Sequence, residues 1–364
     1  STIIKEVNGT IKVWGERAAN NGSSDVLSPI EVNSANGYNY QGYILKIAGG
    51  GNRGSNTQFL ILTTEGLYAW GSEGRVIHEN LTNGTAFGKV NPTASANVPG
   101  TNAYSLPMGV NPMDVKMMFG SYYTLAIVTH SGEAWILSKD EKFGDGSSGS
   151  SGNIQEVWHR IHKSPTETLD NVVAMRGNRK GMMALTLDGK VYTWGTRVYL
   201  GDGNSHSDIT YATEMTIPSG TPKLIGMTLE GTQDNSHFLL MTNGDLYALG
   251  KNSSRQLGEY STSSQHDWGR VKGANSNTNL PPIVWFSPNE HDARGYPAVN
   301  ALTFDGKLWS WGSNAGQMIG AGSNTGGKDP FEMGRGLDQN DRLTAVETGG
   351  HTTMVIKQCS KKYG

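Results

Sequence analysis

The clearest copy of the phrase that decides the fold is Asp305-Gly306-Lys307-Leu308-Trp309-Ser310-Trp311-Gly312. It consists of a turn-forming residue with a glycine, an alternating apolar run and a closing Trp-Gly. Related phrases recur along the whole chain, and their marker glycines are Gly9, Gly66, Gly132, Gly189, Gly244 and Gly306. Successive markers are 55 to 66 residues apart. A regular spacing of this length is typical of a repeat architecture.

Each phrase predicts the turn and the third strand of a four-stranded unit. Asp-Gly or Asn-Gly between two apolar runs is the strongest short hairpin signal, because the turn favours positive φ. A preceding strand is visible at residues 59–62, 125–128, 183–186 and 238–241, and a strand before it at 44–49, 115–120, 172–177 and 344–349. A short last strand follows at 29–32, 87–90, 268–271 and 330–333. Four strands in about 60 residues correspond to one β-propeller blade.

The repeats therefore predict an all-β chain that forms one domain over residues 1–364, a closed six-bladed β-propeller. Five blades are complete between the first and last markers. The last blade is expected to be shared by the two termini, with early strands at 331–333, 345–348 and 354–356 and its final strand at 10–14. Such sharing removes exposed sheet edges. Residues 2–5 duplicate the second strand of the hairpin in this last blade. As an alternative, they pair elsewhere and add an irregular strand.

Composition excludes several classes of function. The chain has 30 Lys and Arg against 32 Asp and Glu, scattered along its length, so no footprint for nucleic acid is expected. The single Cys359 cannot form an internal disulfide, and no Cys/His cluster is spaced to bind zinc. No apolar run approaches the ~20 residues of a membrane helix. The N-terminus lacks a signal-peptide pattern, which predicts that a leader or an initiator methionine was removed before Ser1.

Catalytic motifs are also missing from the sequence. It contains no Walker A, HExxH or GxSxG pattern. Residues 49–54 spell GxGxxG, but a strand follows them where dinucleotide binding needs a helix. We therefore expect a protein that is not an enzyme, with no catalytic residue, no cofactor and no metal.

The Gly66–Gly71 phrase, with segments 252–258 and 313–318 that follow two of its copies, resembles the repeat of the regulator of chromosome condensation family. His351-Thr352-Thr353 after Gly349-Gly350 looks like the Gly-x-x-His-Thr element of that repeat. The resemblance covers essentially the whole chain and implies a β-propeller. The founding member is similar but has seven repeats, and here Leu137 and Leu249 replace the phrase's tryptophan in two copies. For function the resemblance implies a guanine-nucleotide exchange factor or another intracellular regulator of a small GTPase, although none of the family's functional residues can be carried over.

The aromatic residues of the phrases are expected to be structural. Alternation in a strand sends neighbouring side chains to opposite faces, where they pack between blades. This applies above all to Trp14, Trp70, Trp194 and Trp311. A sugar-stacking lectin is the alternative.

Two sets of loops differ between repeats, and recognition is usually placed on variable loops held by rigid strands. One set follows the Trp-Gly phrase at residues 72–84, 138–152 and 313–328. The other follows the short strand at 33–41, 91–111 and 272–281, and it holds Tyr38, Tyr40 and Tyr104 among Asn, Ser and Pro. Tyrosine in such surroundings is typical of adaptable binding surfaces. We therefore predict binding through Tyr38, Tyr40 and Tyr104, with packing of these rings onto the propeller as the alternative.

The first functional hypothesis is a non-catalytic binding or structural module. Low charge and an abundance of Asn, Ser, Thr and Gly favour an exposed virion component, such as a phage tail or receptor-binding part, or a bacterial surface adhesin. The expected partner is another protein or a cell-surface receptor or glycan, with no nucleic acid and no membrane insertion, and the expected location is extracellular or on a virion surface. The alternatives are the small-GTPase regulator and a proteinaceous enzyme inhibitor.

Overall fold

The computed structural model describes residues 1–51, 56–91, 101–138, 143–148, 157–205, 207–291, 295–323, 326–334, 336–338 and 340–358. The chain is all-β, with 50% of residues in strands and 4% in helices, and has a six-bladed β-propeller arrangement. The predicted all-β class and six-bladed propeller arrangement are thereby confirmed. The helical residues form short 3₁₀ turns, which include η1 (Ser34–Asn36), η2 (Glu79–Leu81), η3 (Pro112–Asp114) and η5 (Ala315–Gln317).

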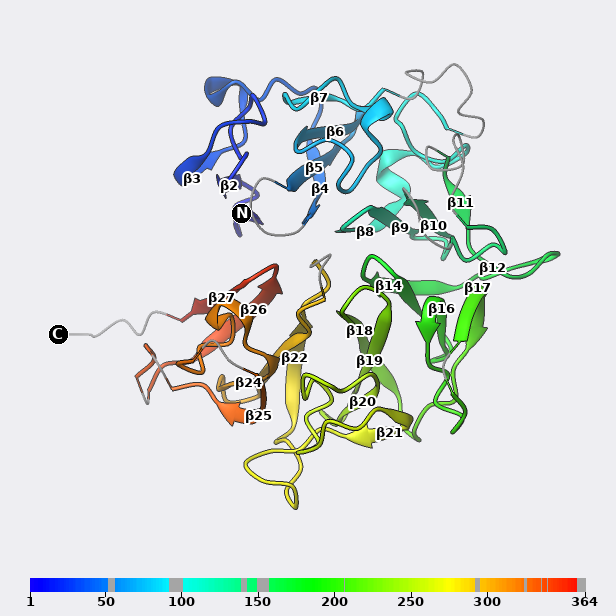
Figure 1. Cartoon of the computed structure of the whole chain (residues 1–364). Coiled ribbons are helices and arrows are strands. Elements are labelled where there is room, and N and C mark those ends of the chain that lie inside the picture. The colour runs from blue at the N-terminus through cyan, green and yellow to red at the C-terminus, as the bar shows by residue number, and fades with distance from the viewer. Residues whose placement is uncertain are drawn as a thin grey trace. The chain divides into compact units, whose positions relative to one another are not determined.

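Five four-stranded antiparallel sheets form the complete blades (Figure 1). The first is β4 (Ile44–Gly51), β5 (Thr57–Thr63), β6 (Gly66–Gly71) and β7 (Gly88–Lys89). The second is β8 (Val115–Ser121), β9 (Thr124–Thr129), β10 (Ala134–Ser138) and β11 (His159–Arg160). The third is β14 (Val172–Gly177), β15 (Gly181–Thr186), β16 (Val191–Val198) and β17 (Ser207–Glu214). The last two are β18 (Pro222–Glu230), β19 (Asp234–Met241), β20 (Leu246–Gly250) and β21 (Gln265–Arg270), then β22 (Ile283–Pro288), β23 (Ala298–Thr303), β24 (Leu308–Ser313) and β25 (Gly327–Glu332).

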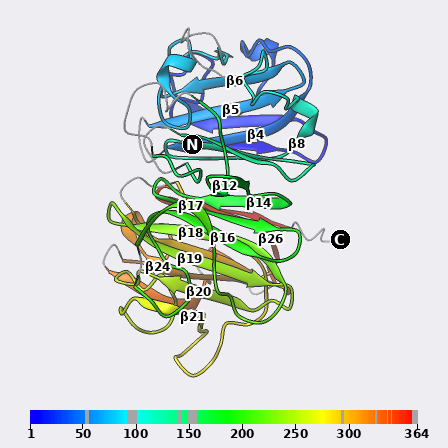
Figure 2. The ribbon, with the colours of Figure 1, turned by 90° about the vertical axis from the view of Figure 1, so that its right-hand side faces the viewer.

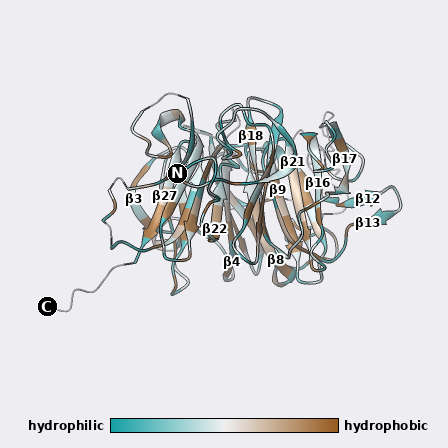
Figure 3. Ribbon diagram, turned by 90° about the horizontal axis from the view of Figure 1, so that it is seen from below, coloured by the Kyte–Doolittle hydropathy of each residue, from teal (hydrophilic) through white to brown (hydrophobic). Residues whose placement is uncertain are grey.

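Smaller sheets complete the strand inventory of the described residues. β1 (Thr2–Lys5), β2 (Ile11–Gly15) and β3 (Val26–Glu31) form a three-stranded sheet. β26 (Leu343–Gly349) pairs with β27 (Thr352–Lys357). A two-stranded excursion, β12 (His162–Ser164) with β13 (Glu167–Thr168), is coloured hydrophilic in Figure 3.

By its contacts the chain divides into two compact units. The first unit comprises Ser1–Met175, Thr186–Asp188 and Ile209–Ala212, and the second comprises Arg176–Leu185, Gly189–Asp208 and Thr213–Gly364. In the first unit, β4, β5 and β6 run side by side (Figure 2). Closure of the ring and the single domain over residues 1–364 concern both units together and stay predictions.

The terminal strands pair differently from the expected shared blade. β1 pairs with β2 from Thr2↔Trp14 to Lys5↔Ile11, whereas β26 and β27 form a sheet of their own. The segment 331–333, expected in this blade, instead belongs largely to β25, the last strand of the preceding one. A five-residue connection joins β1 to β2. Closing so short a loop costs far less chain entropy than joining strands from the two chain ends.

The central strands of a blade are buried on both faces. Every residue of β23 and β24 is buried, and so is every residue of β6. The neighbour of Trp311, Ser310, is accordingly buried, and its hydroxyl donates to Asn300 Oδ1 at 2.6 Å. Substitution of Ser310 is therefore expected to disturb packed surroundings, because both faces of this inner strand are covered.

Three of the four predicted structural tryptophans are fully buried. Trp70, Trp194 and Trp311 are at most 1% exposed, and Trp14 in β2 is half-buried. Two of the indoles are also hydrogen-bonded, because Trp70 Nε1 donates to the carbonyl oxygen of Ala18 at 3.0 Å and Trp311 Nε1 to that of Gln256 at 2.8 Å. Both acceptors lie in the loop between the last two strands of the preceding sheet, so each indole links two sheets of its own unit.

Candidate functional site

The structure places Tyr38 inside the core of the first unit. Its side chain has no exposed surface, and its ring makes edge contacts with Trp70 and Phe87 at centroid distances of 5.5 and 5.4 Å. Its hydroxyl donates to the carbonyl oxygen of Ala18 at 2.6 Å, and burial raises its pKa to about 12. The prediction that Tyr38 is an exposed binding residue is wrong, because its loop folds the ring back beneath the strands.

Tyr40 and Tyr104 are half-buried and pack against two different clusters of the first unit. The Tyr40 ring meets Tyr68 edge-on at 6.4 Å, and burial raises the pKa of Tyr40. The carbonyl oxygen of Tyr104 accepts a hydrogen bond from Leu67 N at 3.2 Å. A binding role for these two residues stays a prediction. Part of their loop set, residues 92–100, lies outside the described residues.

Other apolar side chains are exposed at the end of the sheets where these loops lie. Tyr43 is 81% exposed, Met113 66% and Leu187 78%. Tyr43 lies just before β4, Met113 just before β8, and Leu187 in the turn between β15 and β16. Tyr43 and Asp114, the neighbour of Met113, accept backbone hydrogen bonds from the turn between the second and third strands of their sheets, and Leu187 lies in such a turn.

Backbone hydrogen bonds place each of these positions at a turn between the second and third strands of a sheet, and one further bond links two of the sheets. Thr64 N, in the β5–β6 turn, donates to Tyr43 O at 3.0 Å. His130 N, in the β9–β10 turn, donates to Asp114 O at 2.8 Å, beside Met113. Leu187 N donates to Asn171 O at 2.8 Å, and the residue after Asn171 donates to Gly132 O in the β9–β10 turn at 3.0 Å. We call the exposed residues Tyr43, Met113 and Leu187, with their acidic neighbours, the hairpin-turn surface.

The hairpin-turn surface combines apolar and acidic groups. Glu65, Asp114 and Asp188 are exposed beside Tyr43, Met113 and Leu187 respectively. Asp114 also caps its own 3₁₀ turn by accepting from Asn111 N at 2.8 Å. Exposed apolar side chains with polar neighbours are a feature of interaction sites on proteins.

Sequence reasoning selected the loops at this end but not these residues. Leu187 stands two positions before its marker glycine, where other copies of the phrase have Thr64, His130 or Thr242. Phe304 holds the same position in the second unit and is 76% exposed. The first copy has Val7 at this position, which is also exposed, so apolar residues fill it in three copies and polar residues in the other three. An apolar residue at the tip of a hairpin turn was the available signal, and it did not single out Leu187.

A polar cluster lies on the inner strands of the second unit. The Arg176 guanidinium, on β14, contacts Glu290 through Nη2 at 2.5 Å and Nε at 3.0 Å. The other Glu290 oxygen accepts from Met227 N at 3.3 Å. Burial raises the pKa of Glu290 to about 7, although Arg176 opposes this shift. Burial likewise raises the pKa of Glu347 on β26 and lowers that of His291 to about 4. Through Glu290, which follows β22, these contacts join the strands β14 and β18.

The described part of the chain is expected to lack metal sites and membrane-spanning helices. Within it, no three or more His, Cys, Asp or Glu side chains are grouped so that they could bind a metal ion. No helix among the described residues is long and apolar enough to cross a membrane.

No family model matches this sequence. RCC1 domain-containing protein RUG3 of Arabidopsis thaliana, named as mitochondrial, is 24% identical over 244 residues, which are 64% of this chain and 49% of the relative. This chain thus spans about half the length of that relative.

Two solved structures resemble almost the whole chain. Human WBSCR16 has a TM-score of 0.66 and 15% identity, with 96% of this chain and 82% of that chain covered. Prp20p of Saccharomyces cerevisiae has a TM-score of 0.67 and 15% identity, with 99% and 81% covered. The chain is an RCC1-like β-propeller.

These similarities correct one expectation. A location outside cells or on a virion surface is wrong, because the similar proteins include one named as mitochondrial and one characterised for its binding to histones. The role of phage tail component or adhesin loses its support with it. Abundant Asn, Ser and Gly reflect the many turns of a propeller, so they do not report on location.

Proposed function

We propose that this protein is a non-catalytic, protein-binding regulator that engages its partner through the hairpin-turn surface of the first unit. The observation that carries the proposal is the exposure of Tyr43, Met113 and Leu187 at one end of three consecutive sheets. Exposed apolar side chains are retained at a cost in solubility, and contact with a partner protein buries them. The acidic neighbours Glu65, Asp114 and Asp188 favour a partner with basic residues around an apolar patch.

More specifically, we propose that the protein regulates a small GTPase by promoting nucleotide exchange. It is supported by the likeness to Prp20p, whose structure was described together with its binding to Gsp1p and histones, and which has also been solved bound to Kap60. Those three partners are proteins, which favours a protein partner here over a glycan.

The binding proposal is tested with a triple variant, Tyr43→Ser, Met113→Ser and Leu187→Ser. Partners are captured from cell extract, quantified by mass spectrometry, and the most enriched one is purified for titration. We expect the variant to weaken its binding at least tenfold without changing the melting temperature, because exposed substitutions usually change stability by no more than about 0.5 kcal/mol.

The matched control is Leu27→Ser in the same unit. Leu27 is 94% exposed and lies near the start of β3. This start is at the opposite end of the sheet from the β1–β2 turn. Loss of binding in Leu27→Ser but not in the triple variant would refute the assignment of the hairpin-turn surface.

The exchange proposal has its own measurement. Release of a fluorescent GDP analogue from purified Gsp1p, and from a panel of other small GTPases, is followed with and without the protein. Acceleration by the parent and not by the triple variant supports an exchange factor that works through this surface. A protein that binds its partner tightly but accelerates no member of the panel is a regulator of another kind.

A further inference from the structure

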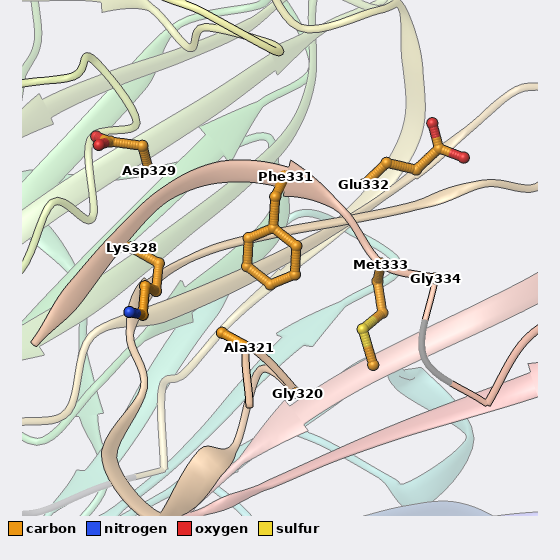
Figure 4. Close-up of a pocket in the computed structure, with 8 residues that line it drawn as sticks. All are labelled: Gly320, Ala321, Lys328, Asp329, Phe331, Glu332, Met333 and Gly334. Carbon is orange, nitrogen blue, oxygen red and sulfur yellow. The ribbon is translucent and has the colours of Figure 1, made fainter. Parts of the chain in front are cut away.

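An open groove runs along β25, the outermost strand of its sheet in the second unit. It has a volume of about 490 Å³ and is lined by β25 and by the segment that follows η5 (Figure 4). A volume of this size is within the range of pockets that bind small molecules or single peptide side chains. None of its lining residues belongs to the hairpin-turn surface.

The floor of the groove is apolar. Phe331 and Met333 point from β25 and the residues just after it toward Ala321 (Figure 4). All three are partly buried and pack against the edges of two core clusters. Met333 approaches Gly320 so closely that a Cβ there would lie 2.4 Å from the Met333 methyl carbon. A side chain at position 320 would therefore displace the end of the Met333 side chain at the edge of the groove.

One end of the groove carries a positive charge. Lys328 lies on the same side of β25 as Phe331, because an irregularity in the pairing with β24 falls between them. Within the described residues, the Lys328 ammonium has no ion-pair or hydrogen-bond partner. Asp329 points away from the groove and is neutralised by Arg255, whose Nη1 lies 2.7 Å from Asp329 Oδ2. Glu332 also lines the groove, but its side chain points away from Phe331 and Lys328 (Figure 4). The side of the groove that holds Phe331 thus combines an apolar floor with an unpaired cation.

The backbone of β25 is poorly suited to adding another strand. Pro330 lies in the middle of this edge strand and has no N–H group to donate. Edge strands that contain proline are protected against pairing with another chain. Recognition at this place therefore depends on side chains.

We propose that the β25 groove binds a segment of a partner protein in which an aliphatic or aromatic side chain stands next to a carboxylate. The apolar side chain fills the space above Phe331, Met333 and Ala321, and the carboxylate pairs with Lys328. Charge complementarity selects this chemistry, because Lys328 is the cation that faces the groove without a partner in the described part of the chain. This site does not depend on the hairpin-turn surface.

The test uses protein labelled with ¹³C in its methionine methyl groups. The Met333 signal is assigned by its loss in Met333→Leu. The probe is the capped dipeptide acetyl-aspartyl-leucine amide, compared with its lysyl-leucine and alanyl-leucine counterparts. We expect the aspartyl probe to shift the Met333 signal saturably in the millimolar range and the lysyl probe to bind more weakly.

Charge reversal separates this site from a general apolar contact. Lys328→Glu should weaken the aspartyl probe about fivefold or more, the upper range for a surface ion pair, and should strengthen the lysyl probe. Lys89→Glu, an exposed lysine on the outermost strand β7 of another sheet, is the matched control and should change neither titration. An unmoved Met333 signal, equal binding of the three probes, or titrations unaffected by Lys328→Glu would each overturn the proposal.

Discussion

The indole nitrogen of Trp311 donates a hydrogen bond to the carbonyl oxygen of Gln256 across 2.8 Å, and it does so from the third strand of one sheet to the loop of the preceding one. Trp70 and Ala18 repeat the relationship in the first unit at 3.0 Å. The tryptophan of the repeated phrase therefore serves two purposes, because it fills the space between sheets and pairs a loop carbonyl that packing hides from water.

Trp311 is expected to contribute through both volume and hydrogen bonding. Trp311→Ala should lower the free energy of unfolding by about 3–5 kcal/mol, the cost of emptying a large aromatic site. Trp311→Phe keeps most of the volume but leaves the Gln256 carbonyl unpaired, which should cost about 1–3 kcal/mol. Urea unfolding of the three proteins measures both effects. Losses below about 1 kcal/mol in both variants would show that the site is not packed as described.

Tyr38 should contribute to the stability of the folded protein. Tyr38→Phe removes the hydroxyl that donates to Ala18 O at 2.6 Å, and because Trp70 Nε1 still donates to that oxygen we expect a loss of about 0.5–1.5 kcal/mol. Tyr38→Ser also opens a cavity and should cost about 3–5 kcal/mol. Tyr43→Ser, a change of an exposed tyrosine nearby in the sequence, is the control and should stay within about 0.5 kcal/mol of the parent. Equal melting temperatures for Tyr38→Ser and the parent would restore Tyr38 as a surface residue.

His237 should make the protein less stable in acid. Burial lowers its pKa from 6.5 to about 3, and its Nε2 accepts a hydrogen bond from Tyr199 N at 3.1 Å, which requires the neutral ring. Between these two pH values the unfolded chain binds the proton and the folded chain does not, so stability falls as the pH is lowered from about 6.5 toward 3.

Unfolding free energies at pH 7, 5.5 and 4 test this prediction for His237. His237→Gln should show a flatter dependence than the parent over this range, whereas His130→Gln, a change in an exposed turn, should follow the parent. Parallel curves for parent and His237→Gln would contradict the assignment.

Glu290 should affect the pH dependence of stability in the opposite sense to His237, making the protein less stable as the pH rises. Burial raises its pKa from 4.5 to about 7, so the folded protein keeps a proton that the unfolded chain releases. The stability linked to this proton is fully present below about pH 4.5 and is lost as the pH rises toward 7. Glu290→Gln, which carries no titrating proton, should remove this part of the pH dependence in the same unfolding series. A parent and a variant with the same slope between pH 4.5 and 7 would mean that Glu290 is already ionised beside Arg176.

Much of the fold could be predicted because its signals are local. The phrase at residues 305–312 predicted a turn and a strand, and the structure has the strand β24 at Leu308–Ser313. Marker glycines such as Gly189 and Gly306 have positive φ, of 80° and 82°, as a tight hairpin turn requires. Repetition of this local signal was sufficient to predict the number of blades and the position of most strands.

The functional surface could not be predicted in the same way. The pattern of Tyr among Asn and Ser suggested exposure for Tyr38, yet the ring is buried by Trp70 and Phe87, which are more than 30 residues away in the sequence. Leu187 looks like one more apolar residue beside a strand, and only its place at the tip of a turn exposes it. Composition suggested a place outside the cell, although a turn-rich propeller has the same composition wherever it acts.

The sequence by itself determined the repeat, the hairpins and the β-propeller class, because turn chemistry and strand alternation depend on residues a few positions apart. The tertiary structure alone decided that Ser310 is as buried as Trp311, that β1 pairs with β2, and that Lys328 lies beside Phe331 in a groove. These features depend on which sheet covers each face and on where strand pairing is irregular. Burial and charge at a given position are properties of contacts between distant segments, and no local pattern specifies them.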